Sequence, residues 1–385
     1  MHAIDSFLIP ISLLIALLVA YFFTPFFKRE GETRFQNIDG LRGYLAFFVY
    51  LHHSSIWFFY LKSGSWDRPP SSLYTYLGTG SVIMFFMITA FLFFNKLLDA
   101  KGESIAWHRL YISRVLRIGP LYICCVLVVF FIAAYQTGFT LSDPIGKLIV
   151  NILHWLALGL LTLHDINGVK DSILIMAGVL WTLPYEWLFY FLLPLWAFSL
   201  RIKFPKKYWF IALFGVVLFI KYWNIFILLP FLFGGIAAVL CRKQCVLIFC
   251  KGKFASIIIL LGLVMAVNFF SEPLSFIPEL ILFVVFLLVV GGNSLFGMLS
   301  ARASCVLGEI SYGVYLLHGI CLYVTFNFFI GIDQMRDINW FNFSGIILAL
   351  TPVLIVLSVL SYKFIEQPAI LLTSNVSKKM VKLFN

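Results

Sequence analysis

Long apolar runs separated by short polar connections make up most of this chain. Twelve runs approach the roughly 20 apolar residues that a transmembrane helix needs. They cover residues 4–27, 43–61, 73–98, 110–135, 145–163, 178–200, 208–220, 224–240, 254–270, 275–291, 305–330 and 343–365. This pattern predicts an all-α polytopic membrane protein.

The composition excludes the usual soluble classes of protein. Of the 385 residues, 62% are hydrophobic and only 12% are charged, and the mean hydropathy is +0.99. A soluble domain has roughly 25% charged residues, so this chain has too few to cover a globule of its size. A soluble enzyme, a disordered chain, a coiled coil and a nucleic-acid-binding module are therefore excluded. The seven cysteines match neither a disulfide framework nor a zinc pattern, so no metal is expected.

The distribution of Lys and Arg predicts which runs cross the membrane. Strongly basic connections occupy residues 28–42, 96–117, 201–207, 242–253 and 378–382. Because Lys and Arg collect in cytoplasmic loops, all of these connections should lie on one side. They do so only if the run 145–163 is a re-entrant or interfacial helix. We therefore expect eleven transmembrane helices with the N-terminus outside and the C-terminus in the cytoplasm, which leaves six of the 28 Lys and Arg outside.

A few ionisable residues fall inside the apolar runs, where each costs about 2.5–3.5 kcal/mol at mid-bilayer. They are His52, His53, Glu186, Glu309 and His318, with Arg42, Arg114 and Arg117 at the predicted helix starts. Such side chains normally face an interior cavity rather than lipid. The set predicts a polar intramembrane site with a basic cytoplasmic mouth, which suits either an enzyme or a transporter.

Arg42 and His53 are placed by the helix that connects them. The segment Asp39-Gly40-Leu41-Arg42-Gly43 precedes the predicted helix, and His53 follows Arg42 by eleven residues. At 1.5 Å per residue His53 lies ~16 Å deeper than Arg42, near the bilayer centre. His52 points about 100° away and competes for the same role. Taken alone, Arg42 is equally well explained as an arginine at the membrane interface. A lone buried histidine such as His53 is usually packed against a neighbouring helix.

Arg114 and Arg117 lie three residues apart and therefore share one face of a helix. Two neighbouring guanidinium groups repel each other unless an anion lies between them, and their forked donors suit phosphate. With Arg42 they form a predicted anion clamp for a nucleotide or coenzyme A. Spacing alone is equally compatible with a basic pair that anchors the helix at the membrane surface.

Glu186 and His318 are the remaining candidates inside the membrane. The segment Trp181-Thr182-Leu183-Pro184-Tyr185-Glu186 opens another predicted helix, with Glu186 about two turns inside and at the depth of His53. A carboxylate and an imidazole at one depth suggest a general base and the group that orients it, although a structural pair is the alternative. His318 lies mid-helix and either handles substrate or is a satisfied core histidine.

As a set, these motifs resemble the acyltransferase-3 family, membrane-bound O-acyltransferases of cell-surface glycans and some small molecules. The resemblance rests on residues 39–43 with His53, Arg114-Val-Leu-Arg117-Ile, the segment 181–186, residues 310–318 and residues 362–368, in the family's order. The ten spans expected after the first helix also fit the family's ten-helix core.

The resemblance implies transfer of an acyl group, usually acetyl from acetyl-CoA, to a sugar hydroxyl. It implies that His53 rather than His52 is catalytic, that Glu186 occupies the family's acidic position, and that Arg42, Arg114 and Arg117 hold coenzyme A. Trp181, Tyr185, His52 and His318 are then expected to contact the acceptor. Pro184, Tyr185 and Trp187 depart from the commoner family pattern, in which Trp187 is replaced by a second acidic residue.

We accordingly expect an extra transmembrane helix at residues 1–27, an acyltransferase domain at 28–370 and a basic cytoplasmic tail at 371–385, with no fused esterase-like domain. The expected partners are acyl-CoA as co-substrate, a saccharide or polyprenyl-linked glycan acceptor and the lipid bilayer, with no nucleic acid and no tightly bound cofactor. The expected location is a bacterial cytoplasmic membrane. The alternative function is a transporter or flippase of a lipid-linked saccharide. Gly119, Pro120 and Pro184 are able to break helices as in transporters, but the sequence shows no repeated halves.

Overall fold

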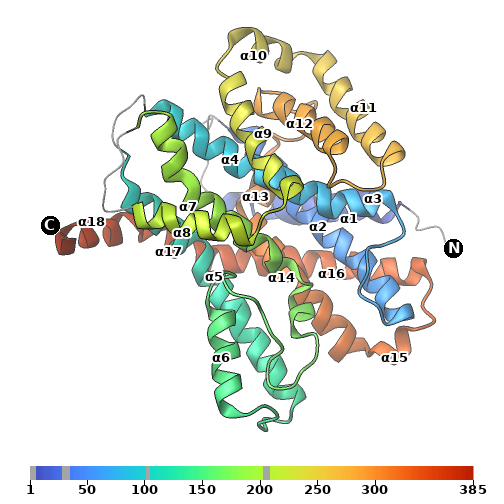
Figure 1. Ribbon diagram of the computed structural model, residues 1–385. Coiled ribbons are helices and arrows are strands. Elements are labelled where there is room, and N and C mark those ends of the chain that lie inside the picture. Colours follow the sequence, from blue (N-terminus) through green and yellow to red (C-terminus); the bar gives the residue numbers. More distant parts are fainter. Residues whose placement is uncertain (1–5, 28–34, 101–104, 203–208, 385) are drawn as a thin grey trace. The chain divides into compact units, whose positions relative to one another are not determined.

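Helices joined by loops make up the part of the chain that the computed structural model describes, which is residues 6–27, 35–100, 105–202 and 209–384 (Figure 1). Within these residues the only β pairing is an isolated bridge between Ile166 and Val169. The predicted all-α class is therefore confirmed for the described chain. Parts of three predicted basic connections, at residues 28–34, 101–104 and 203–208, lie outside it, as do residues 1–5 of the predicted first helix and residue 385 of the tail.

Each of the twelve predicted runs coincides with at least one helix. The α-helices are α1 Leu8–Phe22, α2 Gln36–Ser63, α3 Ser72–Thr75, α4 Ser81–Asp99, α5 Trp107–Gln136, α6 Ile145–Leu156, α7 Leu183–Ser199, α8 Trp209–Lys221, α9 Ile225–Leu240, α10 Gln244–Lys251, α11 Lys253–Phe269, α12 Phe276–Val290, α13 Arg302–Glu309, α14 Ser311–Val324, α15 Ile332–Met335, α16 Trp340–Ser361, α17 Gln367–Leu371 and α18 Thr373–Phe384. Short 3₁₀ and π segments are η1 Thr24–Phe26, η2 Tyr76–Gly80, η3 Ser172–Met176, η4 Val179–Thr182, η6 Thr325–Ile330 and η7 Tyr362–Glu366.

The lengths of the helices limit how many are recognisable as membrane spans. Four described helices are long and apolar enough to cross a membrane: Ser72–Asp99, Trp107–Gln136, Ser311–Ile330 and Trp340–Lys379. A fifth is added if α9 and α10, bent by 104°, form one broken span. Other apolar helices are shorter; the 15 residues of α12 cover about 22 Å of a hydrocarbon core about 30 Å thick. The eleven predicted spans are therefore not confirmed, whereas the 12 residues of α6 fit a helix that does not cross.

The start of α2 corrects one sequence-based prediction. The helix begins at Gln36, so residues 39–43 form part of its first turns and do not precede it. Gly40 lets these first turns lie directly against Leu299, because a Cβ atom there would clash with the backbone of Leu299. Gly308 of α13 is equally close to the backbone of Asp39. Gly308 thus lets α2 and α13 pack backbone to backbone, as small residues do in membrane helix pairs, and Gly40 does the same for α2 and the turn before α13.

The start of α7 corrects a second prediction. The run 178–200 is α-helical only from Leu183 onwards, because Gly178 lies in the left-handed region at φ 71° and residues 179–182 form a 3₁₀ turn. Pro184 stands at the first positions of α7, where a missing N–H costs no hydrogen bond. Glu186 therefore lies in the first α-helical turn rather than two turns inside the helix.

The helices group into two compact units. Unit 1 contains residues 1–96, 224–315 and 324–358, and unit 2 contains residues 97–223, 316–323 and 359–385. In unit 1, α13 packs against both α1 and α2, and α12 packs against α9 and α11. In unit 2, α7 packs against α8, and α5 packs against α6, α17 and α18. Unit 1 carries Arg42, His52, His53 and Glu309, the last residue of α13, and unit 2 carries the other candidate residues. The predicted limits at residues 27 and 370 stay predictions.

Candidate active site

In unit 1 the two adjacent histidines of α2 have the same tautomer. Nδ1 of His52 lies 2.8 Å from the carbonyl oxygen of Tyr74, and Nδ1 of His53 lies 3.0 Å from that of Val49. A carbonyl oxygen only accepts hydrogen bonds, so Nδ1 carries the proton in both rings. In the neutral imidazole the basic lone pair is then on Nε2.

Packing distinguishes the two histidines. The His52 residue is only 7% exposed, and its ring fills the space next to Gly78, where a Cβ atom would overlap it. With its hydrogen bond to Tyr74, His52 fastens α2 to α3 and η2. His53 is half-buried, which makes its ring the more accessible imidazole. The geometry therefore gives His52 a packing role and leaves His53 the better placed of the two for chemistry.

Arg42 and His53 lie on one uninterrupted helix, as expected. The Arg42 guanidinium is 4.0 Å from Oδ1 of Asp39, one turn earlier, and its side chain is 20% exposed. Since α2 is continuous from Gln36 to Ser63, eleven residues separate Arg42 from His53 by ~16 Å along the axis. The length of a pantetheine arm is of the same order, so the spacing is compatible with a bound coenzyme A.

In unit 2 the hydroxyl of Tyr190 connects α5 with α7. The Arg114 guanidinium donates a hydrogen bond to this hydroxyl, and Arg117 is a second nearby positive charge. The hydroxyl in turn donates to Oε2 of Glu186, 3.4 Å away. The Tyr111 hydroxyl donates to the Tyr190 carbonyl at 3.2 Å and fixes the same pair of helices. Unit 2 thus brings the predicted arginine pair, Arg114 and Arg117, together with Glu186, which was predicted independently of them.

Tyr190 itself was missed by the sequence analysis. It is one of 17 tyrosines, and its residue is only 3% exposed. Tyr190 follows Glu186 by four residues, so both side chains lie on one face of α7. This spacing is the one feature of the sequence that pointed to Tyr190 as a partner of Glu186. A buried tyrosine hydroxyl normally finds a partner, but the sequence does not show that the partner comes from α5.

The start of α7 also carries a small group of aromatic side chains. The ring of Trp181 meets that of Tyr185 edge to face, with centroids 6.1 Å apart. Tyr185 in turn lies 5.8 Å from the ring of Tyr222, just after α8. Trp181 is exposed and Tyr185 is half-buried. These residues offer apolar faces with polar edges, as in many ligand sites.

His318 lies in the interior of unit 2 and is completely buried. A Cβ atom at its neighbour Gly319 would clash with the backbone of Met176 and Ala177, so α14 approaches the segment after η3 very closely. This environment resembles that of a packed core histidine. A contact between His318 and the acceptor stays a prediction.

Comparison with known families agrees with the pattern of motifs. The acyltransferase-3 family model, described as an acyltransferase domain, matches residues 35–363. The chain belongs to the acyltransferase-3 family. The matched region contains Arg42, His53, Arg114, Arg117 and Glu186, and membership gives membrane acyl transfer as the class of reaction. No curated protein and no solved structure matches the chain.

Proposed function

We propose that this acyltransferase moves an acyl group, most simply acetyl, from acyl-CoA to a hydroxyl of a cell-surface or lipid-linked saccharide. The observation that supports the acyl-CoA donor is the group of Arg114, Arg117 and Glu186 around Tyr190. Two guanidinium groups and one carboxylate near the same hydroxyl leave an excess of positive charge. Half-buried positive charge of this kind favours an anion, and the forked donors of arginine match phosphate oxygens.

His53 supplies the base of the proposed reaction. As the acceptor hydroxyl attacks the thioester carbonyl, Nε2 of His53 takes its proton, and the C–S bond breaks. The departing thiolate of coenzyme A then takes this proton from His53, so the products are an ester and free coenzyme A. The bond between Nδ1 and the Val49 carbonyl holds the ring and its tautomer. A route through a transient acyl-imidazole at Nε2 uses the same lone pair.

The remaining predicted residues fall into donor and acceptor groups. Arg42 assists in binding coenzyme A from the cytoplasm, and Trp181 and Tyr185 contact the acceptor, which enters from the outer side or as a lipid-linked unit. The protein then lies in a bacterial cytoplasmic membrane with its N-terminus outside. This orientation follows the distribution of Lys and Arg along the chain.

The proposal is tested with the purified full-length protein, radiolabelled acetyl-CoA and an extract of cell-envelope glycan. We expect label to pass to the glycan fraction and an equal amount of free coenzyme A to appear. Movement of a lipid-linked glycan across vesicle membranes without any labelling would instead support the flippase alternative. Hydrolysis of acetyl-CoA without a labelled acceptor would contradict the proposed acceptor class.

Replacing Tyr190 with phenylalanine is expected to weaken acyl-CoA binding while the fold is kept. The variant keeps the ring but removes the hydroxyl that joins Arg114 to Glu186. Hydrogen bonds to charged groups contribute about 1.5–3 kcal/mol, so KM for acyl-CoA should rise about tenfold or more. Initial rates across acyl-CoA concentrations measure this. Tyr111→Phe is the matched control, because the Tyr111 hydroxyl joins the same two helices but donates to a backbone carbonyl. An equal rise of KM in both variants would show that Tyr190 has only a packing role.

A further inference from the structure

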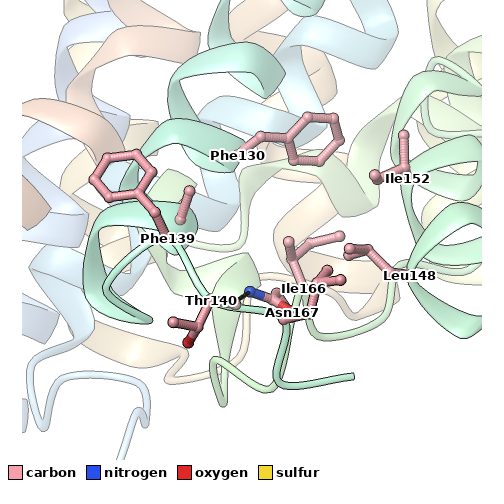
Figure 2. Close-up of a pocket in the computed structure, with 9 residues that line it drawn as sticks. Phe130, Phe139, Thr140, Leu148, Ile152, Ile166 and Asn167 are labelled. Carbon is pink, nitrogen blue, oxygen red and sulfur yellow. Dashed lines mark hydrogen bonds between the residues drawn. The ribbon is translucent and has the colours of Figure 1, made fainter. Parts of the chain in front are cut away.

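An apolar pocket lies near the C-terminal end of α5 (Figure 2). Arg114 and Arg117 belong to the N-terminal part of the same helix. Its volume is about 260 Å³, and its walls come from α5, the loop 137–144, α6 and residues 166–167. The apolar lining includes Phe130, Ala134, Phe139, Leu148, Ile152 and Ile166. Every lining residue belongs to unit 2, and none belongs to the predicted acyl-transfer site.

The polar side chains at the pocket are already satisfied. Oδ1 of Asn167 accepts from the backbone N–H groups of Ser142 and Asp143, and Nδ2 donates to Thr137 and to the carbonyl of Thr140. These four bonds use the full capacity of the amide. The Thr140 hydroxyl donates to the Thr137 carbonyl at 2.6 Å. The pocket therefore offers a ligand almost only apolar contact, which selects a hydrocarbon chain and gives water few partners.

The loop that closes the pocket is held in an unusual backbone conformation. Phe139 and Asn167 have φ of 59° and 51°, in the left-handed region. A bulky residue such as Phe139 adopts this region only where surrounding contacts impose it, at a cost of about 1–3 kcal/mol. The Phe139 N–H bonds the Ala134 carbonyl at 2.7 Å, and Asn167 fixes the opposite side. The pocket is thus preformed, as ligand sites usually are.

The surface around the pocket is apolar as well. Phe131 on α5 is 63% exposed and Leu153 on α6 is 58% exposed. Because α5 is one of the helices suited to span the membrane, the pocket continues a lipid-facing surface. Lys147, at the start of α6, bonds Asp143 at 2.8 Å, and this bond lowers the pKa of the Asp143 carboxyl. An ion pair therefore lies next to Leu148 of the pocket wall.

We propose that the pocket binds one acyl chain of a bilayer phospholipid, with the lipid headgroup near the ion pair of Lys147 and Asp143. Apolar walls gain dispersion contacts when a hydrocarbon chain packs against them, and the neighbouring bilayer supplies such chains. The bound chain would pack between α5 and α6 and hold the loop 137–144 in place. This inference is independent of the acyl donor and acceptor, so it stands or falls separately from the proposed reaction.

The test uses full-length protein in nanodiscs that contain a phospholipid with a diazirine near the end of one acyl chain. After irradiation, peptide mass spectrometry should find label concentrated on the pocket residues of α5 and α6. Leu261 on α11, exposed to a similar degree as Phe131, serves as the reference for random contact with lipid. Labelling of the pocket no greater than at Leu261 would overturn the proposal.

Two variants decide whether the label reports the pocket itself. Ala134→Phe places a ring in the cavity and should lose the pocket label, whereas Leu153→Phe changes the adjacent exposed face and should keep it. If Ala134→Phe does not fold, Ile152→Trp fills the pocket from α6 instead. Persistent labelling in a folded, filled variant contradicts the proposal. Displacement of the label by a polyprenyl phosphate but not by unlabelled phospholipid would also overturn it, since the occupant would then be an isoprenoid chain.

Discussion

The His53→Ala variant is expected to lose acyl transfer while it still inserts into the membrane and folds. The basic lone pair of His53 is on Nε2, because its Nδ1–H donates a hydrogen bond to the Val49 carbonyl. Removing a positioned general base costs about 10²–10⁴-fold in rate, which would bring transfer close to background. The imidazole is only half-buried, so its loss should leave the packing of α2 nearly unchanged. Release of coenzyme A per folded protein, at saturating acyl-CoA, measures the effect.

His52→Ala is the matched control on the same helix. Its ring fills the space beside Gly78 and bonds Tyr74, so we expect a lower Tm and less folded protein. Per folded molecule, however, acyl transfer should persist. The assignment would be overturned if His53→Ala kept normal activity, or if His52→Ala alone lost activity per folded molecule.

The sequence predicted the existence of the helices well, for a physical reason. Inside a bilayer the backbone must satisfy its own hydrogen bonds, so long apolar runs have few structures other than a helix. The starts of helices were predicted less well. The first turn of α2 contains Gln36, Asn37 and Asp39, which a search for apolar residues passes over. The start of α7 is set by Gly178 and Pro184, and these act through backbone geometry rather than hydropathy.

The candidate site shows the same division between local and long-range features. The shared face of Arg114 and Arg117 follows from helix periodicity alone, and the structure contains that helix. The role of His52 does not follow from helix periodicity, because it depends on Gly78, which lies 26 residues later in the chain. The hydrogen bond between Arg114 and Tyr190 does not follow from it either, because that bond requires α5 and α7 to meet. Spacing predicts which side chains share a face, but only the packing of helices decides what that face meets.

The double variant Arg114→Ala, Arg117→Ala is expected to raise KM for acyl-CoA strongly. Each guanidinium is half-buried on α5, and a charge-assisted hydrogen bond to phosphate contributes about 1.5–3 kcal/mol. One arginine should therefore account for about 10–100-fold in binding, and the pair for more, although residues this close are not additive. Loss of Arg114 also removes a partner of Tyr190. Initial rates at increasing acyl-CoA, together with the rate at saturation, separate a loss of binding from a loss of chemistry.

Two further variants show whether the forked donors or merely the charges are needed. Arg109→Ala removes an exposed arginine from the same helix and should leave KM nearly unchanged. The double variant Arg114→Lys, Arg117→Lys keeps both positive charges but loses the forked donors of arginine, so it should keep only part of the affinity for acyl-CoA. Binding of phosphate by these arginines also predicts that KM for acyl-CoA rises with salt in the wild type, because added ions screen charges that solvent still reaches. An unchanged KM in the double alanine variant, or an equal rise in Arg109→Ala, would remove Arg114 and Arg117 from the donor site.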